Sequence, residues 1–386
     1  MKKVARYGMR VGAGTVMAAT PVLIWTGSAQ SAPAAPTQPV VGQTYTQEQA
    51  ASDGMLDESV SPLSDGGSLY SYTSQFSAGS VQYPVPPQGF SPLTGSAAQL
   101  AEYGFPPRPS SGTALSEWLT AMTNYTGTPI PDLLLRADPD SHTVATSPEQ
   151  GAEPQSTQQD VGAPSAASTL ARAGNWAGYI ASLSSPNYVA TIGTAVLPST
   201  STYCGSGSKM PVWTGLGGAG GFAGGGNLMQ EGIDYNNIDP GQIIPFYELI
   251  YNDNSHNWQT ELGSSNLGVG AGNSIYMQLS YQASTETAFF YIENEFNGEA
   301  SSAYKSGPDI AAYYDGTSAE WITEQFGGGG PGAVPLKNFS PIQWYGAQAE
   351  LSNGNWKAIN AGPNWKVYSG QSSTDITGYP GMTGSP

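Results

Sequence analysis

The sequence predicts an all-β protein in which residues 173–386 form a two-sheet antiparallel β-sandwich. From residue 173 onward, short runs of Val, Ile, Tyr, Phe and Trp alternate with turn-forming Gly, Asn, Ser and Asp. No stretch there keeps the apolar spacing of a helix over ten positions. Strands spread over so long a segment are too many for one small barrel, so we expect two packed sheets.

Two short segments show the strand pattern directly. Residues 274–281 alternate Ile275, Met277, Leu279 and Tyr281 with mostly polar neighbours. This spacing predicts a half-buried strand, with one face in the core and the other in water. Residues 288–292, with the sequence Ala-Phe-Phe-Tyr-Ile, predict a second strand.

Two glutamates stand inside aromatic strand-like runs. Strand alternation places Glu248 on the same face as Phe246, and Glu320 on the same face as Ile322 and Glu324. A carboxylate that shares a face with Phe or Ile lies either in a cleft or on an exposed edge. Taken one at a time, each glutamate also fits an ordinary solvated strand position.

The N-terminus predicts export. Residues 1–32 contain a basic start, an apolar stretch from about residue 11 to residue 25, and small residues at 28–32, which together predict a signal peptide. The alternative is a membrane anchor, but Thr15, Thr20 and Pro21 interrupt a stretch shorter than the ~20 apolar residues needed to span a bilayer. We expect a secreted, extracellular protein that is not membrane-bound after signal removal.

The proline content distinguishes two segments in the rest of the chain. Residues 33–172 contain 17 Pro in 140 positions, and residues 173–386 contain 12 in 214. Residues 140–170 are rich in Ser, Thr, Gln, Ala and Pro and predict a flexible linker. Residues 97–135 predict a more ordered patch with one short helix near 113–122. This is the layout of a secreted zymogen with a propeptide at 33–172; the competing interpretation is an inert cell-wall stalk.

The charge balance excludes nucleic acid as a partner. The chain has 12 basic and 29 acidic residues, a net charge of −17, and no basic cluster beyond its first ten residues. Only 11% of the residues are charged, against about 25% in ordinary soluble proteins. A surface of neutral polar groups suits work in acid, and it also fits adhesins and cell-wall proteins.

Several hydrolase mechanisms lack their residues. Residues 173–386 contain one histidine, His256, and neither a Gly-x-Ser-x-Gly nor a His-Glu-x-x-His motif. The single cysteine, Cys204, has no partner for an intramolecular disulfide. Asp315-Gly-Thr317 has the wrong order for an aspartic peptidase loop and predicts a tight turn. We expect no metal or other cofactor, which leaves carboxylate and carboxamide chemistry.

Six segments, taken in order, carry a family resemblance: Asn-Trp-Ala-Gly-Tyr at 175–179, Trp-Thr-Gly-Leu-Gly-Gly at 213–218, Leu-Met-Gln-Glu-Gly at 228–232, Phe-Tyr-Glu at 246–248, Ala-Glu-Trp-Ile-Thr-Glu at 319–324 and Phe-Ser-Pro at 339–341. Together they resemble the motifs of the glutamic peptidases, also called eqolisins. Each motif is weak alone, but their order and spacing are specific. The resemblance covers about residues 173–345, and Tyr-Gly-Phe-Pro-Pro-Arg-Pro at 103–109 is similar to the family's propeptide.

The resemblance implies a secreted acid endopeptidase with a concanavalin or lectin-like jelly-roll sandwich, acting on protein or peptide substrates. Carried over by motif position, the catalytic residues are Gln230 and Glu320. The substrate-binding positions implied are Trp213, Phe246, Tyr247 and Glu248.

Two positions depart from the family's motifs. Its Asp before the second Gly is Gly217 here, and its Trp before Tyr-Glu is Phe246. These departures affect the expected substrate cleft and the polar network behind the dyad, and they leave the dyad itself intact.

The resemblance also suggests that the propeptide inhibits its own enzyme. We expect the 97–135 segment to cover the cleft at neutral pH, with Arg108 paired to an active-site carboxylate and acid weakening that pair. The absence of coiled-coil or repeat patterns leads us to expect a monomer. Two alternatives remain open: a secreted lectin-like carbohydrate-binding or adhesive sandwich without catalysis, and a glycosidase that uses Glu248 and Glu320 as paired carboxylates.

Overall fold

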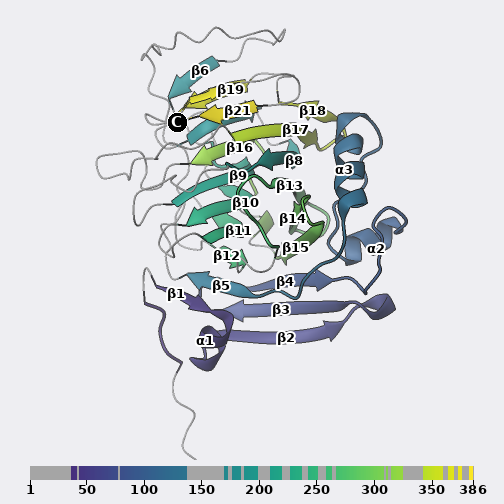
Figure 1. Ribbon diagram of the computed structural model, residues 1–386, viewed down its shortest axis with the longest axis vertical. Helices are drawn as coiled ribbons and strands as arrows, with labels where there is room; N and C mark the ends of the chain where they lie inside the picture. Colours follow the sequence, from purple (N-terminus) through teal and green to yellow (C-terminus); the bar gives the residue numbers. More distant parts are fainter. Residues whose placement is uncertain are drawn as a thin grey trace, which may run out of the picture. The chain divides into compact units, whose positions relative to one another are not determined.

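Two β-sheets make up most of the structure, which is a computed structural model (Figure 1). It describes residues 36–40, 43–76, 79–136, 169–172, 176–183, 187–198, 209–219, 227–236, 242–250, 258–262, 267–307, 310–311, 314–324, 342–359, 364–368, 373–375 and 382–385. The predicted signal peptide, nearly all of the predicted linker, Cys204 and His256 lie outside the described residues.

The first sheet, sheet A, has ten strands among the described residues. Their order across the sheet is β1 (Thr44–Thr46), β5 (Leu133–Arg136), β12 (Trp258–Leu262), β11 (Gln242–Ile250), β10 (Leu228–Asn236), β9 (Lys209–Gly217), β16 (Ser318–Glu324), β7 (Trp176–Ser182), β19 (Asn364–Tyr368) and β6 (Thr169–Arg172). Neighbouring strands are antiparallel, except that β6 runs parallel to β19.

The second sheet, sheet B, has eleven strands among the described residues. Their order is β2 (Leu56–Pro62), β3 (Ser68–Ser74), β4 (Ser80–Val85), β15 (Glu299–Ser306), β14 (Thr287–Asn294), β13 (Ser274–Gln282), β8 (Tyr188–Val196), β17 (Ile342–Leu351), β21 (Met382–Ser385) and β20 (Ser373–Asp375), with β18 (Trp356–Ala358) paired to β17. Both predicted strands are confirmed, as β13 and β14.

The main core lies between the two sheets. It takes alternate residues from each, for example Val212 and Leu249 from sheet A and Met277 and Phe290 from sheet B, all at most 2% exposed. Such alternation is the pattern of strands that turn one face to a shared interior. The predicted two-sheet sandwich is confirmed, and neither sheet closes into a barrel.

The N-terminal segment, defined here as residues 36–136, is more ordered than the sequence predicted. It contains α1 (Gln47–Ser52), the short 3-10 helix η1 (Ser64–Gly66), α2 (Ala97–Glu102), α3 (Gly112–Asn124) and five strands. The predicted helix is confirmed as part of α3. The strands were missed because β2 exposes all of its residues except Leu56, so it lacks an apolar face for the pattern to reveal.

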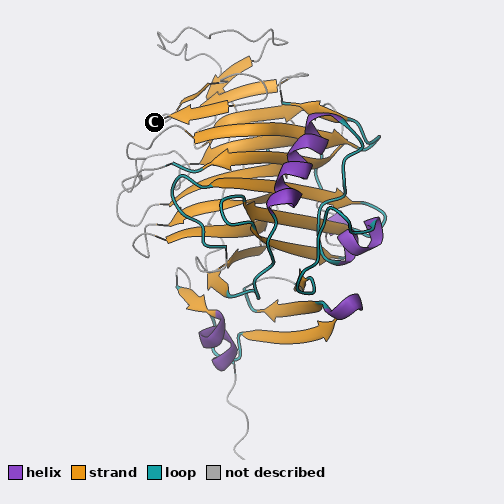
Figure 2. Cartoon of the chain, turned by 45° about the vertical axis from the view of Figure 1, so that its right-hand side comes forward, coloured by secondary structure: helices purple, strands orange, loops and turns teal. Residues whose placement is uncertain are grey.

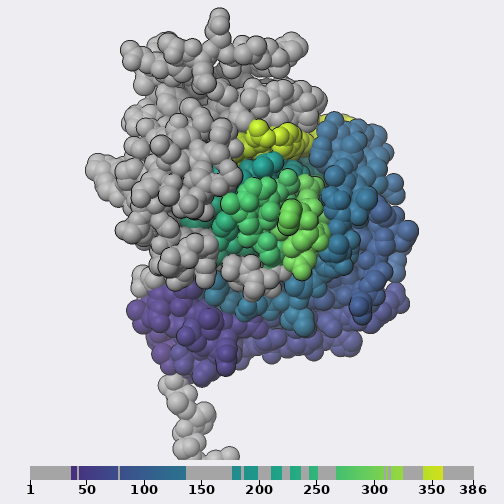
Figure 3. All heavy atoms as spheres, in the orientation of Figure 1, coloured from purple at the N-terminus to yellow at the C-terminus, as the bar shows by residue number. Residues whose placement is uncertain are grey.

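This segment extends both sheets of the sandwich. Strand β5 pairs with β12 in sheet A, and β4 pairs with β15 in sheet B. In the space-filling view, its purple and blue residues adjoin the green residues of the sandwich (Figure 3). All described residues belong to one compact unit, Pro36–Pro386. No helix within the described ranges is long and apolar enough to cross a lipid bilayer.

Helices α2 and α3 cover the outer face of sheet B (Figure 2). Trp118 of α3 and Leu100 of α2 pack with Tyr276, Tyr291 and other residues of that face in a second core. The expectation that β13 is half-buried is therefore wrong. Its polar-looking face, which carries Tyr276 and Gln278, is buried beneath the N-terminal segment.

The structure contradicts the expected role of Arg108. Its guanidinium lies 5.5 Å from the centre of the Trp118 ring, in a cation–π contact on the sheet B side of the molecule. No described residue forms an ion pair with it. Helices α2 and α3 of the 97–135 segment pack on sheet B, and its strand β5 joins the edge of sheet A beside β12, whereas the predicted dyad belongs to the central strands β10 and β16 of sheet A. The large apolar side chains of α3 determine this docking. The Arg108 pairing was predicted without taking them into account.

The contact between α3 and the sandwich buries carboxyl groups. Glu117 of α3 packs against Gly346 of β17, and Glu295 follows β14. Burial, followed by the charge of Glu117, raises the pKa of Glu295 to about 7. Burial also raises the pKa of Glu117 and, more strongly, that of Glu293. Protonation of these glutamates therefore favours the contact between α3 and the sandwich. From the sequence we expected the opposite, a contact that weakens in acid.

Replacing Glu295 by Gln should flatten the pH dependence of stability. In the unaltered chain, the contribution of Glu295 is complete below about pH 4.5 and is lost as the pH rises through about 7, on the order of 2–3 kcal/mol in total. Urea unfolding from pH 4 to 8 measures this loss, with exposed Glu48→Gln as the matched control. Equal slopes for Glu295→Gln and Glu48→Gln would contradict the assignment.

Candidate functional site

The two residues that the motifs single out stand in one row across sheet A. Glu320 of β16 lies opposite Gly215 of β9, Gly215 lies opposite Gln230 of β10, and Gln230 lies opposite Glu248 of β11. Directly opposed residues of antiparallel strands point to the same face. With strands about 4.8 Å apart, the Cα atoms of Glu320 and Gln230 are separated by about 10 Å, with only a glycine between them.

This row belongs to the face of sheet A that is turned away from sheet B. Apolar residues around the row form a cluster separate from the main core, and they come from the strands of the row, from the adjacent β7 and from the residues that follow β9: Trp176, Ile180, Trp213, Ala219, Leu228, Phe246, Ile250 and Ile322. The intervening residues of these strands, such as Val212 and Trp321, belong to the main core. The row and helices α2 and α3 therefore lie on opposite outer faces of the sandwich.

Gly215 stands between the two residues, and its surroundings leave no room for a side chain. A Cβ atom there would lie 2.9 Å from Trp213 Cζ3, 2.9 Å from the Met229 carbonyl oxygen and 3.0 Å from Leu228 Cδ1. Any side chain at this position would therefore collide with its surroundings. Glycine at this position lets Trp213 and Leu228 pack over the strand that separates Gln230 from Glu320.

A short hydrogen bond fixes the amide of Gln230. Its Nε2 donates to Glu248 Oε2 at 2.6 Å, and both residues are at most 1% exposed. This bond assigns the amide nitrogen to the Glu248 side and leaves Gln230 Oε1 without a hydrogen-bond partner among the described residues. A bond from an amide to a carboxylate in a dry interior is stronger than one between neutral groups, so it holds the amide orientation firmly.

Glu320 is an isolated buried carboxyl group. It is fully buried, and neither of its carboxylate oxygens has a hydrogen-bond partner within the described part of the chain. Burial raises the pKa of Glu320 well above its ordinary value; the nearby Ser318 hydroxyl lowers it and the Asp315 charge raises it further, both to a smaller extent. Unpartnered buried acceptors are rare and destabilising, and they are common at sites that bind or transfer protons.

A second row, Trp213–Gly232–Phe246, lies beside the first on the same face of sheet A. Trp213 Nε1 donates to Glu324 Oε2 at 3.1 Å, and Trp213 packs edge-on against Trp176 at 4.9 Å between ring centres. Phe246 lies opposite Gly232, which lies opposite Trp213. A Cβ on Gly232 would lie 2.5 Å from Trp213 Cβ, so this glycine provides the space for the indole. Alternation had placed Glu324 on the Glu320 face, but its bond to Trp213 was not predicted.

Tyr247 is not part of this arrangement. It lies on the opposite face of β11, in the main core, where its Oη donates to the Ser301 carbonyl oxygen at 2.9 Å and its ring packs near Tyr83 and Phe290. The structure brings five of the six predicted residues to one face: Gln230, Glu320, Trp213, Phe246 and Glu248. It does not bring Tyr247 to that face.

Gly217 has a structural reason to depart from the family's Asp. Its φ is +85°, and a Cβ there would overlap the Asn227 carbonyl oxygen and lie 3.1 Å from Asp315 Cβ. Asp315 Oδ1 accepts hydrogen bonds from Thr317 N at 3.0 Å and Thr317 Oγ1 at 2.6 Å, so the predicted turn at Asp315 is confirmed. The backbone oxygen and Cβ of Asp315 therefore lie beside Gly217, an approach that sequence spacing did not reveal.

The row combines the groups that water-mediated hydrolysis requires. It offers an oriented amide with one further N–H, the free acceptor Gln230 Oε1 and two free carboxylate oxygens on Glu320. Within the described ranges, no group of three or more His, Cys, Asp or Glu side chains is arranged to hold a metal ion.

Gly217→Asp should destabilise the protein more than the same change at Gly354. Both glycines have positive φ, +85° and +80°, but a Cβ on Gly354 meets nothing within 4 Å. The backbone strain of about 1–2 kcal/mol is therefore common to both, and crowding adds about 1–3 kcal/mol at position 217 alone. Urea unfolding measures the difference, and equal losses for the two variants would show that Gly217 is not crowded.

Comparisons with known proteins identify the family of the chain. The sequence model described as "Peptidase A4 family" matches residues 174–379. A crystal structure of scytalido-glutamic peptidase with a transition state analog inhibitor is 20% identical, covers 55% of this chain and 97% of that chain, and gives a TM-score of 0.42. The structure of SCP-B, a member of the eqolisin family, in complex with the tripeptide Ala-Ile-His has the same identity and coverage and a TM-score of 0.41.

A search of the curated proteins gave no match. The family match spans more than half of the 386 residues. The chain therefore belongs to the Peptidase A4 family, the family of the glutamic peptidases or eqolisins.

Proposed function

We propose that this chain is the precursor of a secreted, acid-active endopeptidase that cleaves proteins with a Gln230–Glu320 dyad. The observation that carries the proposal is the row Glu320–Gly215–Gln230–Glu248, in which a fixed amide and an unpartnered carboxyl group stand on one face of the sheet on either side of a glycine. Membership of a peptidase family supports the reaction class.

The first step is attack by water. A water molecule placed between the dyad residues donates hydrogen bonds to Gln230 Oε1 and to a carboxylate oxygen of Glu320. Glu320 takes a proton as the water oxygen attacks the peptide carbonyl carbon, and the carbonyl oxygen becomes an oxyanion. The second N–H of Gln230 Nε2 stabilises this oxyanion. A single such donor contributes about 3–4 kcal/mol in other hydrolases.

The second step is departure of the amine. Glu320, now a carboxylic acid, returns its proton to the peptide nitrogen, the carbon–nitrogen bond breaks, and the carboxylate form is restored. Glu248 acts through Gln230, because its hydrogen bond fixes which end of the amide points toward the substrate. Trp213 and Phe246 supply the apolar walls beside the reacting bond.

Acid activity follows from the carboxyl groups of the sandwich. Glu320 must ionise to act as a base, which sets the lower pH limit once water has entered its site. At higher pH, the other buried carboxyl groups lose the protons that stabilise the fold. Burial raises the pKa values of Glu231 and Glu293 well above the ordinary value, so their contribution to stability is present in acid and lost as the pH rises.

Latency of the full chain is part of the proposal. Gln230 and Glu320 are fully buried in the full-length chain, so a substrate reaches them only after part of the chain has moved. We also propose that the chain is cleaved within residues 140–172, after export directed by residues 1–32. Residues 33–172 then act as the propeptide and residues 173–386 as the monomeric enzyme.

The two alternatives fit the site less well. A glycosidase would pair Glu248 with Glu320, but three strand spacings separate them and Gln230 occupies the Glu248 carboxylate. A sugar-binding sandwich would need exposed aromatic side chains, whereas Trp213, Trp176 and Phe246 are fully buried.

Glu320→Gln should abolish acid proteolysis. We expect the processed chain to cleave a denatured protein between pH 2 and 7, with most activity in acid, and to resist the aspartic-peptidase inhibitor pepstatin. Glu320→Gln should lower kcat/KM by about 10²–10⁴-fold because general acid–base catalysis is lost. Gln230→Ala should lower it by about 10²–10³-fold through loss of the oxyanion donor.

The matched control is Glu286→Gln, which changes an exposed glutamate outside the site and should leave the rate unchanged. Full activity in Glu320→Gln with normal folding would refute the dyad. Loss of activity in Glu286→Gln as well would show that the assay reports stability instead of catalysis.

A further inference from the structure

A second site lies on the other outer face of the sandwich. A cavity of about 500 Å³ opens between sheet B and the 95–108 stretch of the N-terminal segment. This volume is within the range of about 300–1,000 Å³ that holds small-molecule and short peptide ligands. The dyad lies on the outer face of sheet A, so this cavity is separate from the proposed peptidase site.

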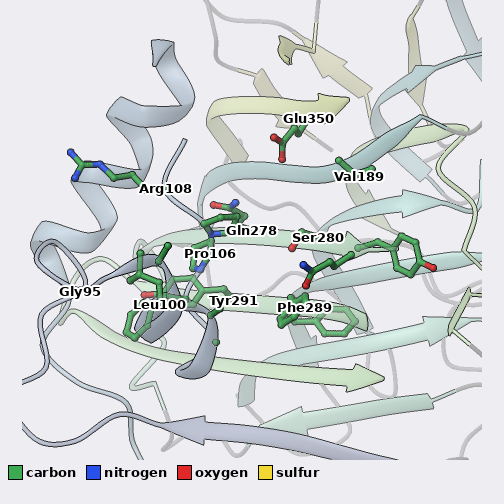
Figure 4. A pocket seen from close by; sticks show the side chains of 18 residues that line it. Gly95, Leu100, Pro106, Arg108, Val189, Gln278, Ser280, Phe289, Tyr291 and Glu350 are labelled. Carbon is green, nitrogen blue, oxygen red and sulfur yellow. The ribbon is translucent and has the colours of Figure 1, made fainter. Parts of the chain in front are cut away.

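One wall of the cavity is a row of the sheet. Glu350 of β17 lies opposite Ala190 of β8, Ala190 lies opposite Ser280 of β13, and Ser280 lies opposite Phe289 of β14. Ala190 is small, so Glu350 and Ser280 flank a shallow gap about 10 Å wide at the Cα atoms. Figure 4 shows Glu350, Ser280 and Phe289 around the same space.

The cavity floor carries an unpartnered donor. Gln278 is 2% exposed, and its Oε1 accepts a hydrogen bond from Tyr276 Oη at 2.6 Å. Its Nε2 is buried and has no hydrogen-bond partner within the described part of the chain. Leaving such a group unpaired costs about 1–3 kcal/mol, which an acceptor oxygen on a ligand would recover. The Gln278 side chain lines the cavity.

The charge in the cavity comes from Glu350. Burial raises the pKa of this carboxyl group, and no described residue donates a hydrogen bond to it. Arg108 also borders the cavity, but its guanidinium lies over the Trp118 ring, and Figure 4 shows it extended toward a helix. A cationic group on the ligand is therefore matched by Glu350.

Apolar side chains enclose the rest of the space. Leu100, Phe105 and Pro106 of the N-terminal segment face Phe289 of the sheet across it. A ligand that fits combines an ammonium group, a nearby carbonyl oxygen and an aliphatic or aromatic side chain. The free N-terminal residue of a peptide has this combination of groups, and capture of terminal amines is a known mode of peptide recognition.

We infer that this cavity binds the free N-terminus of a short peptide that begins with an apolar residue. The ammonium group pairs with Glu350, the first carbonyl oxygen accepts from Gln278 Nε2, and the side chain lies among Leu100, Phe105 and Phe289. Because the walls come from both the N-terminal segment and the sandwich, bound peptide stabilises their association. This inference does not depend on the proposed peptidase activity.

Calorimetric titration of the full chain tests it, in a Glu320→Gln background so that the peptide is not cleaved. The probe is leucyl-leucinamide, and we expect measurable binding at pH 7. N-acetylation of the probe should weaken binding at least tenfold, because it removes the ammonium group. The amine 3-methylbutylamine, which keeps the ammonium and the apolar chain but lacks the carbonyl, should also bind at least tenfold more weakly.

Substitutions in the chain test the Glu350 contact and the cavity separately. Glu350→Gln should weaken leucyl-leucinamide binding at least tenfold, while exposed Glu48→Gln should leave it unchanged. Ala101→Trp, on the exposed side of α2, should fill the cavity and abolish binding without altering the sheet. No binding of leucyl-leucinamide, equal binding of its acetylated form or of 3-methylbutylamine, or unaltered binding in both Glu350→Gln and Ala101→Trp would overturn the inference.

Discussion

The site on sheet A depends on one position that has no side chain. Gly215 stands between Gln230 and Glu320, and any Cβ there would meet Trp213, Leu228 and the Met229 backbone at 3.0 Å or less. The surrounding strands are fully paired and buried, so they do not move aside for a larger residue. The proposed dyad therefore depends on this glycine, which separates Gln230 and Glu320 on one face of the sheet, and the Glu248 hydrogen bond fixes the Gln230 amide.

The same fold explains how buried acids coexist with stability. Glu231, Glu293 and Glu320 are carboxyl groups in a dry interior, and burial raises the pKa of each. Such groups are tolerated in the interior as neutral acids, so the stability that they contribute is present in acid and lost as the pH rises. Glu117 of the N-terminal segment and Glu295 of the sandwich also have raised pKa values, so the stability that they contribute to this contact is present in acid and lost as the pH rises.

The sequence predicted the parts of the molecule that have a periodic apolar pattern or carry family motifs. The two-sheet sandwich, the α3 helix and the common face of Glu248 and Phe246 follow from periodicity. Alternation would also have separated Tyr247 from Glu248, because neighbours in a strand point to opposite faces; the family motif led us to group them. The strands of the N-terminal segment and the approach of Asp315 to Gly217 depend on long-range pairing, which local patterns do not contain.

The most direct test of this account is a crystal structure of the processed enzyme bound to a peptide in which a hydroxyl-bearing carbon replaces the scissile carbonyl. The account predicts that this hydroxyl lies above Gly215, within hydrogen-bond distance of both Gln230 Nε2 and a Glu320 carboxylate oxygen. A peptide bound elsewhere, or a hydroxyl in contact with neither residue, would contradict it.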